Sequence, residues 1–230
     1  MIRSVPHDRL GVTPEQARAL KVYSLLMGEV RVRTDAMLRF AGADEAFPTP
    51  TGGEAAFLQL RLVCELIALG CLVAHGDLKE VKSARLQKAY EADFIIKSLE
   101  RLHGDFFPVP HTTEVRSNVI EGVNSYHFAP HSGGALTKED LIKLYRRTGA
   151  VLHRGSLKAL FSTDRNEVSL IEEAVEAHGK IVALLSTHHV MTRDREFVIV
   201  CAIPESGDVQ AAFAGRIPFN ECDCSDLVVV

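Results

Sequence analysis

The chain lacks the short motifs that identify several large enzyme classes. Its 230 residues contain no GxxxxGK[ST], GxGxxG or GxSxG sequence, so nothing points to nucleotide-dependent, dinucleotide-dependent or α/β-hydrolase chemistry. The sequence contains no HxH or HExxH motif of an established zinc site, and Cys222 and Cys224 are not accompanied by any CxxC pair. We therefore expect no bound metal ion and no other cofactor.

Positive charge is not in excess either. The formal net charge is -4, so any contact with nucleic acid would need a local basic patch. The five cysteines, an odd number, do not form a disulfide framework. The first residues, MIRSVPHDRLGV, have no apolar signal-peptide core, and no stretch of about 18 or more apolar residues is free of charge. We expect a protein of the reducing cytoplasm that does not contact a membrane.

Hydrophobic periodicity predicts an α+β fold. Helices are expected over residues 13–40, 54–77, 78–103 and 137–161, followed by an acidic helix over 164–178. The later runs IVALLSTHHVM, EFVIVCAI and VQAAFAGRI predict a three-stranded antiparallel meander. This organisation gives an N-terminal antiparallel helical bundle over residues 1–161, and a helix with a small C-terminal meander, packed on the bundle, over residues 162–230. The connection 105–134 contains three histidines, His111, His127 and His131, and its middle fits either a strand or a short helix.

Local signals set several helix ends and faces. Thr13 precedes a proline and has Gln16 three residues later, which is the pattern of a capping box. Gly104 marks a stop after the helix predicted over residues 78–103. The inward face of that helix is predicted to consist of five apolar or aromatic residues: Leu86, Tyr90, Phe94, Ile95 and Leu99.

The helix that begins near Glu54 is the most apolar of the chain and is expected to be central. Arg61 and Glu65 interrupt it at an i, i+4 spacing. Because buried charges are costly unless they are paired, these two residues either pair with each other or meet a partner on a neighbouring helix. In the second case Glu65 would orient an arginine of the helix that follows Thr137.

The stretch from Thr137 to Phe161 carries the strongest chemical signal. Thr137 and Asp140 resemble a capping box, and apolar residues recur at helical spacing after them. Arg146 and His153 are seven residues apart, which is a rotation of about 700°, so a continuous helix presents both on one face. Further cations stand nearby in the sequence: Lys143, Arg154 and Lys158.

This arrangement resembles the HEPN superfamily of helical bundles over roughly residues 13–161. Ribonuclease members carry Arg-x(4–6)-His on their last main helix. The sequence RRTGAVLH fits that pattern from Arg146, with six intervening residues, and from Arg147, with five. The resemblance implies a metal-independent endoribonuclease or an RNA-binding protein, and a homodimer in which two such motifs meet in a cleft.

The physical chemistry of the pair agrees with that expectation. Attack of a ribose 2′-hydroxyl on the adjacent phosphate needs proton transfer, which His153 could perform as a general acid or base. The guanidinium of Arg146 or Arg147 suits the phosphate oxygens because it donates planar, charged hydrogen bonds. Glu65, Arg61 and Tyr145 are candidate supporting residues.

Two other interpretations remain open. His153 is also placed to cap the end of its helix or to fill a seam between helices beside Tyr145. The chain as a whole would then be a non-catalytic helical module that dimerises or binds a partner, with the meander as its recognition surface.

Overall fold

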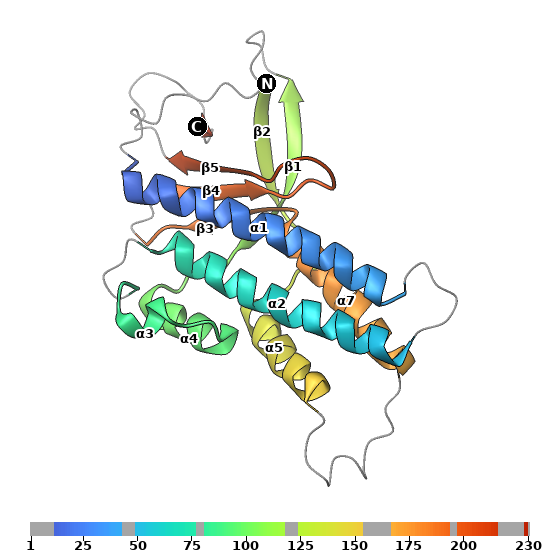
Figure 1. Cartoon of the computed structure of the whole chain (residues 1–230). Helices are drawn as coiled ribbons and strands as arrows, with labels where there is room; N and C mark the ends of the chain where they lie inside the picture. Colours follow the sequence, from blue (N-terminus) through green and yellow to red (C-terminus); the bar gives the residue numbers. More distant parts are fainter. Residues whose placement is uncertain are drawn as a thin grey trace, which may run out of the picture.

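The protein folds into helices packed against one antiparallel sheet, which confirms the α+β prediction (Figure 1). The computed structural model describes residues 12–42, 49–76, 81–117, 124–153, 167–193, 197–215 and 228–229. In Figure 1 the helices lie below strands β3, β4 and β5, and a hairpin of β1 and β2 rises beyond them.

Helix α2 (Pro50–Ala74) is the centre of the helical layer. It packs against α1 (Pro14–Phe40), α4 (Ala92–Leu102), α5 (Lys138–Leu152) and α7 (Glu167–Leu185). Gly70 allows α1 to approach closely, since a Cβ atom at that position would lie 3.0 Å from Met27 Cε. The predicted capping box of α1 is present, because the Thr13 hydroxyl accepts from the Gln16 N–H and the Gln16 amide oxygen accepts from the Thr13 N–H.

One predicted helix is two helices in the structure. In place of a continuous helix over residues 78–103, the chain forms α3 (Ala84–Gln87) and α4, separated by a non-helical connection. Tyr90 lies in that connection and is 63% exposed, so its prediction as an inward residue was wrong. Leu86, Ile95 and Leu99 are buried as expected.

Among the described residues, six antiparallel strands form the sheet in the order β2-β1-β3-β4-β5-β6. They are β1 (Val109–Ser117), β2 (Asn124–Pro130), β3 (Thr187–Met191), β4 (Phe197–Ala202), β5 (Gln210–Gly215) and β6 (Val228–Val229). The expected meander is β3-β4-β5. The connection whose structure was left open forms the β1–β2 hairpin, and β1 pairs with β3. The sheet therefore takes strands from both sides of residue 161.

The first strand of the meander is shorter than the run IVALLSTHHVM predicted. Residues Ile181–Leu185 of that run complete α7, and the strand begins at Thr187. Ile181, Leu184 and Leu185 are buried on the inner side of α7. An apolar run of this kind fits a buried helix and a buried strand equally well, and the interior packing of α7 selects the helix.

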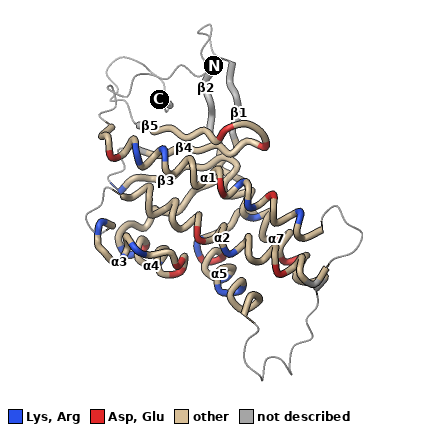
Figure 2. The backbone as a smooth tube through the Cα atoms, viewed as in Figure 1, with Lys and Arg blue, Asp and Glu red and all other residues tan. Residues whose placement is uncertain are grey.

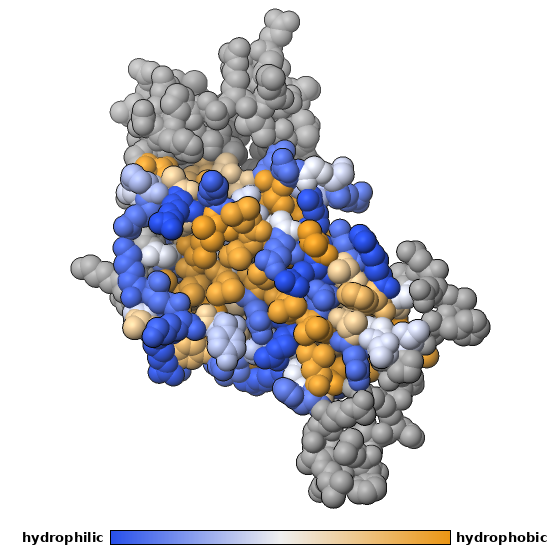
Figure 3. Space-filling model, viewed as in Figure 1, coloured by the Kyte–Doolittle hydropathy of each residue, from blue (hydrophilic) through white to orange (hydrophobic). Residues whose placement is uncertain are grey.

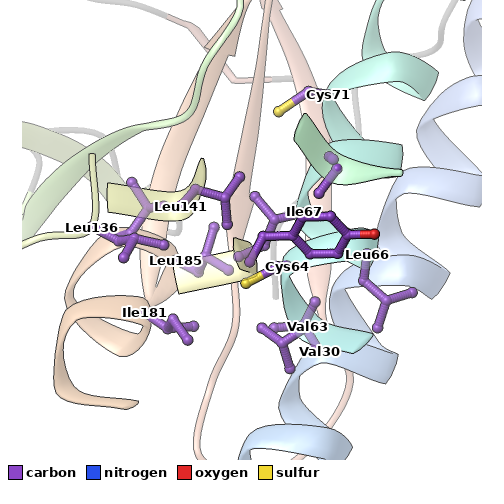
Figure 4. Packing of buried hydrophobic residues seen from close by; sticks show 14 of the residues in the cluster. Val30, Val63, Cys64, Leu66, Ile67, Cys71, Leu136, Leu141, Ile181 and Leu185 are labelled. Atoms are coloured by element: carbon purple, nitrogen blue, oxygen red, sulfur yellow. The ribbon is translucent and has the colours of Figure 1, made fainter. Parts of the chain in front are cut away.

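Aliphatic side chains from α1, α2, α5 and α7 form the core (Figure 4). Ile67 of α2, Leu141 of α5 and Leu185 of α7 are buried there. Cys64 and Cys71 of α2 are buried free thiols, and burial raises the pKa of the Cys71 thiol to about 12 and keeps it protonated.

Helix α2 is also long and apolar enough to cross a membrane, judged by length and composition alone. The stretch Thr51–Ala74 has a mean hydropathy of 2.0 in its most apolar window, and 61% of that window is buried inside the fold. A central core helix passes the same test, so this property is weak evidence for a membrane span.

A buried hydrogen-bonded pair joins α1 to the sheet. The Tyr23 hydroxyl lies 2.6 Å from His188 Nε2, and His188 Nδ1 lies 3.0 Å from the Leu185 carbonyl oxygen. The carbonyl can only accept, so Nδ1 donates to it and Nε2 accepts from Tyr23. Burial lowers the pKa of His188 to about 4, which keeps this tautomer neutral.

We predict that acid weakens the fold through His188. Its pKa is about 4 in the folded chain against 6.5 ordinarily, so the unfolded chain binds an additional proton between these values. The free energy of unfolding should be highest above pH 6.5 and fall as the pH drops towards 4. Urea unfolding at several pH values checks this. His188→Gln, which retains an acceptor for Tyr23, should give a flatter profile, and an unchanged slope would contradict the assignment.

Candidate functional site

Helix α5 carries the three candidate catalytic residues. Its start is fixed by the predicted capping box, in which the Thr137 hydroxyl accepts from the Asp140 N–H. The helix ends at Leu152, and His153 is the C-cap, with an extended backbone (φ -93°, ψ 128°). Arg146 and Arg147 therefore lie within the helix, whereas His153 lies at its end.

Arg146 points towards α4. Its Nε and Nη2 atoms lie 3.1 and 2.7 Å from one carboxylate oxygen of Asp93, and Lys97 approaches the other oxygen at 2.8 Å. Partial burial raises the pKa of Asp93, but the hydrogen bonds from Lys97 and Arg146 outweigh it and hold that pKa below its usual value. The Arg146 guanidinium is thus already bound to a carboxylate.

Arg147 points to the other side, towards α7. Its Nε and Nη2 atoms make hydrogen bonds of 2.8 to 3.1 Å to both carboxylate oxygens of Glu173. This fork-to-fork geometry is the strongest form of an arginine–carboxylate pair, and it raises the pKa of Arg147 further. The two neighbouring arginines therefore tie α5 to two different helices.

His153 is exposed, and its backbone lies about two helical turns beyond that of Arg146. Seven helical residues correspond to about 10 Å along the axis, which separates the backbone of His153 from that of Arg146. The backbone N–H of His153 donates to the Gly149 carbonyl and closes the helix. Arg154 and Lys158, which were predicted to add charge beside it, lie outside the described residues.

The three supporting residues meet in one polar cluster between α2 and α5. Arg61 Nη2 donates to the Tyr145 hydroxyl at 2.8 Å, and that hydroxyl donates to Glu65 Oε1 at 3.3 Å. Arg61 also pairs with Glu65 at 3.3 Å, and its guanidinium carbon lies 4.4 Å from the centre of the Tyr145 ring. Burial, together with the nearby Glu65 carboxylate, raises the pKa of Tyr145, although the positive charge of Arg61 opposes that shift.

Of the two expectations for Glu65, the structure supports pairing with Arg61 and not contact with an arginine of α5. Its carboxylate pairs with Arg61 of its own helix and reaches α5 through Tyr145, and both α5 arginines are bound to other carboxylates. Gly149 lies beside the cluster, since a Cβ atom there would be in ordinary contact, 3.5 Å, with Arg61 Nη1.

The charges around α5 nearly cancel. Acidic and basic residues are interspersed along α4 and α5 (Figure 2), and Lys138 pairs with Glu100 at 2.6 Å in addition to the pairs described above. A phosphate that approached Arg146 or Arg147 would have to displace a carboxylate from each.

Histidines on the sheet and at the ends of α2 and α4 form a second group that the sequence analysis did not bring together. His111 of β1 stacks on His189 of β3 with ring centres 4.6 Å apart, and a ring nitrogen of each faces the other. Burial and the neighbouring His111 lower the pKa of His189 to about 4. His75 and His103 both reach the Met191 carbonyl oxygen, at 3.1 and 3.2 Å. The adjacent pair at residues 188 and 189 was the one signal in the sequence.

Within the parts of the chain that the structure describes, no three His, Cys, Asp or Glu side chains are grouped to hold a metal ion. The Cys222 and Cys224 tail lies outside those parts, and so does the side chain of His127.

No family model, no curated protein and no solved structure matches this chain.

We predict that Tyr145→Phe lowers the free energy of unfolding by about 1 kcal/mol, because Arg61 and Glu65 lose the hydroxyl that joins them. Urea unfolding followed by circular dichroism measures this. Tyr90→Phe is the matched control, since Tyr90 is exposed and its change should leave stability unaltered. Equal stability of the two variants would show that the cluster contributes nothing to the fold.

Proposed function

We propose that this chain is a non-catalytic helical module that pairs with a second copy of itself. The observation that carries the proposal is an apolar surface on the outer side of the two longest helices. We call it the α1–α2 surface, and define it by six residues: Val22, Leu25, Val32, Leu58, Leu62 and Leu69.

The α1–α2 surface is unusual for a solvent-facing helix side. Leu25 is 66% exposed and Leu58 is 44% exposed, while Leu62 and Leu69 are half-buried on the same helix as Leu58. Figure 3 shows hydrophobic residues gathered over α1 and α2, with hydrophilic residues around them. Contiguous apolar patches rimmed by polar residues mark interaction surfaces on soluble proteins.

A second copy is the occupant that this surface suits. A two-fold pairing sets the same leucines of both copies against each other, so one patch supplies both halves of the interface. The Glu29–Arg33 ion pair of α1 carries both signs of charge, and Arg33 also donates to Gln59 of α2, so these polar groups join the two helices and suit a self-complementary interface. The resemblance to HEPN proteins leads to the same expectation of a homodimer.

The state of the α5 arginines supports a non-catalytic role. Arg146 and Arg147 are held by Asp93 and Glu173, and both contacts join helices. Each arginine can thus stabilise the packing of α5 against a neighbouring helix, and this role needs no bound phosphate.

We predict that the purified protein has about twice the 25.3 kDa mass of one chain, measured by light scattering after gel filtration. Leu25→Glu should shift it to the mass of one chain, because a carboxylate would be buried at the interface. Val175→Glu is the matched control: Val175 is 45% exposed on α7 and should leave the dimer intact. A monomeric parent protein at roughly 100 μM would refute the pairing.

A metal-independent ribonuclease is the second candidate function. His153 is exposed at the end of α5, the helix that also carries Arg146 and Arg147, and this common helix favours the candidate. His153 would act as general acid or base, and Arg146 or Arg147 would have to leave its carboxylate to contact the phosphate.

Cleavage of a pool of labelled RNAs in excess chelator tests this candidate. If it is correct, His153→Ala lowers the cleavage rate by roughly 10²- to 10⁴-fold, the usual contribution of such a group. Lys21→Ala is the control, since Lys21 is an exposed cation on α1, outside the candidate site. No cleavage by the parent protein, or equal cleavage by His153→Ala, would eliminate the candidate.

A further inference from the structure

A small open pocket lies at the corner between α3 and α4. Its volume is about 230 Å³, and it is lined by Arg85, Lys88, Ala89, Tyr90, Glu91 and Phe94. Five of these six side chains are charged or aromatic, and they come from a segment of only ten residues. The volume is below the range of about 300–1,000 Å³ that is usual for drug-sized ligands, so the pocket suits one small planar group.

The cations of this pocket differ from those of α5. Neither Arg85 nor Lys88 forms an ion pair with any other residue described in the structure, whereas Arg146 and Arg147 are both bound to carboxylates. Arg85 is held in place by Phe94, since its guanidinium carbon lies 4.6 Å from the centre of that ring. A guanidinium oriented by an aromatic face keeps its N–H edge available for an anion.

Tyr90 and Glu91 supply the other two kinds of contact. Tyr90 is 63% exposed, the second most exposed large hydrophobic residue described in the structure, and its ring is open to stacking. Glu91 is the N-cap of α4, but its side chain makes no capping hydrogen bond to that helix. Its carboxylate is therefore available to accept hydrogen bonds from a ligand.

From this combination we propose that the α3–α4 pocket binds a guanine nucleotide. The base stacks on Tyr90, the phosphate is bound by Arg85 and Lys88, and Glu91 accepts from the adjacent N1–H and N2–H₂ donors of guanine. Adenine presents an acceptor, N1, in the place of one of these donors, so Glu91 disfavours it. The proposal is independent of the pairing through the α1–α2 surface.

The same chemistry is offered by a free mononucleotide and by an unpaired guanine in RNA. Calorimetric titration of the full-length protein with GMP, AMP and guanosine, and with short single-stranded RNAs with and without guanine, distinguishes the two sources. We expect GMP or the guanine-containing RNA to bind at least tenfold more tightly than its adenine counterpart. Binding of GMP alone assigns a free nucleotide, and binding of the RNA alone assigns an RNA guanine.

Variants separate the three contacts. Tyr90→Ala should weaken binding by roughly tenfold through loss of stacking. Arg85→Gln should weaken binding of GMP by a similar factor and leave guanosine unchanged, and Glu91→Gln should reduce the preference for guanine. Lys143→Gln, which removes an exposed cation outside the pocket, is the matched control.

Three results would overturn the proposal. One is the absence of binding by any guanine ligand at roughly millimolar concentration. Another is binding that Tyr90→Ala and Arg85→Gln leave unchanged while both variants keep the circular dichroism spectrum of the parent. The third is equal weakening by Lys143→Gln, which would show a general effect of charge.

Discussion

The burial of α2 is the constraint on which the rest of the structure depends. The helix is apolar on nearly all sides, so it needs neighbours in several directions, and α1, α4, α5 and α7 supply them. Its two charged residues near the middle, Arg61 and Glu65, would be costly among these neighbours if each stood alone. They pair with each other and with Tyr145 of α5, and the position of α5 on α2 follows from that contact.

The same packing ties α5 to two neighbouring helices. It lies between α4 and α7, and each neighbour presents a carboxylate to one of two consecutive arginines. The two arginines of the spacing that resembles the HEPN ribonuclease pattern are therefore both engaged in contacts between helices. The outer side of α1 and α2 stays apolar, and this is the surface through which we propose that two chains pair.

Features encoded by neighbouring residues could be predicted from the sequence. The capping boxes at Thr13 and Thr137 depend on a partner three residues away, and the central position of α2 follows from its composition. The break before α4 was missed, because Tyr90 fits an apolar stripe although it lies outside any helix. The end of α7 was misplaced, because the run up to Leu185 also fits a strand.

Contacts between distant segments could not be predicted in this way. The β1–β2 hairpin joins the sheet through pairing with β3, far along the chain, and nothing local indicates it. The supporting residues Arg61, Glu65 and Tyr145 do meet, as a helix face and a neighbouring helix allow. The partners of Arg146 and Arg147 lie 53 and 26 residues away, so the spacing within α5 carried no information about them.

An exchange of charges between Arg147 and Glu173 tests the account most directly, because it asks whether this arginine holds two helices together. Each single reversal, Arg147→Glu or Glu173→Arg, should lower the free energy of unfolding by roughly 1 kcal/mol, as expected for a half-exposed pair. The doubly exchanged protein should recover most of that loss, which urea unfolding would measure as a coupling free energy. Additive effects of the two reversals, with no recovery, would contradict a structural role for Arg147 and return this arginine to the list of candidate catalytic residues.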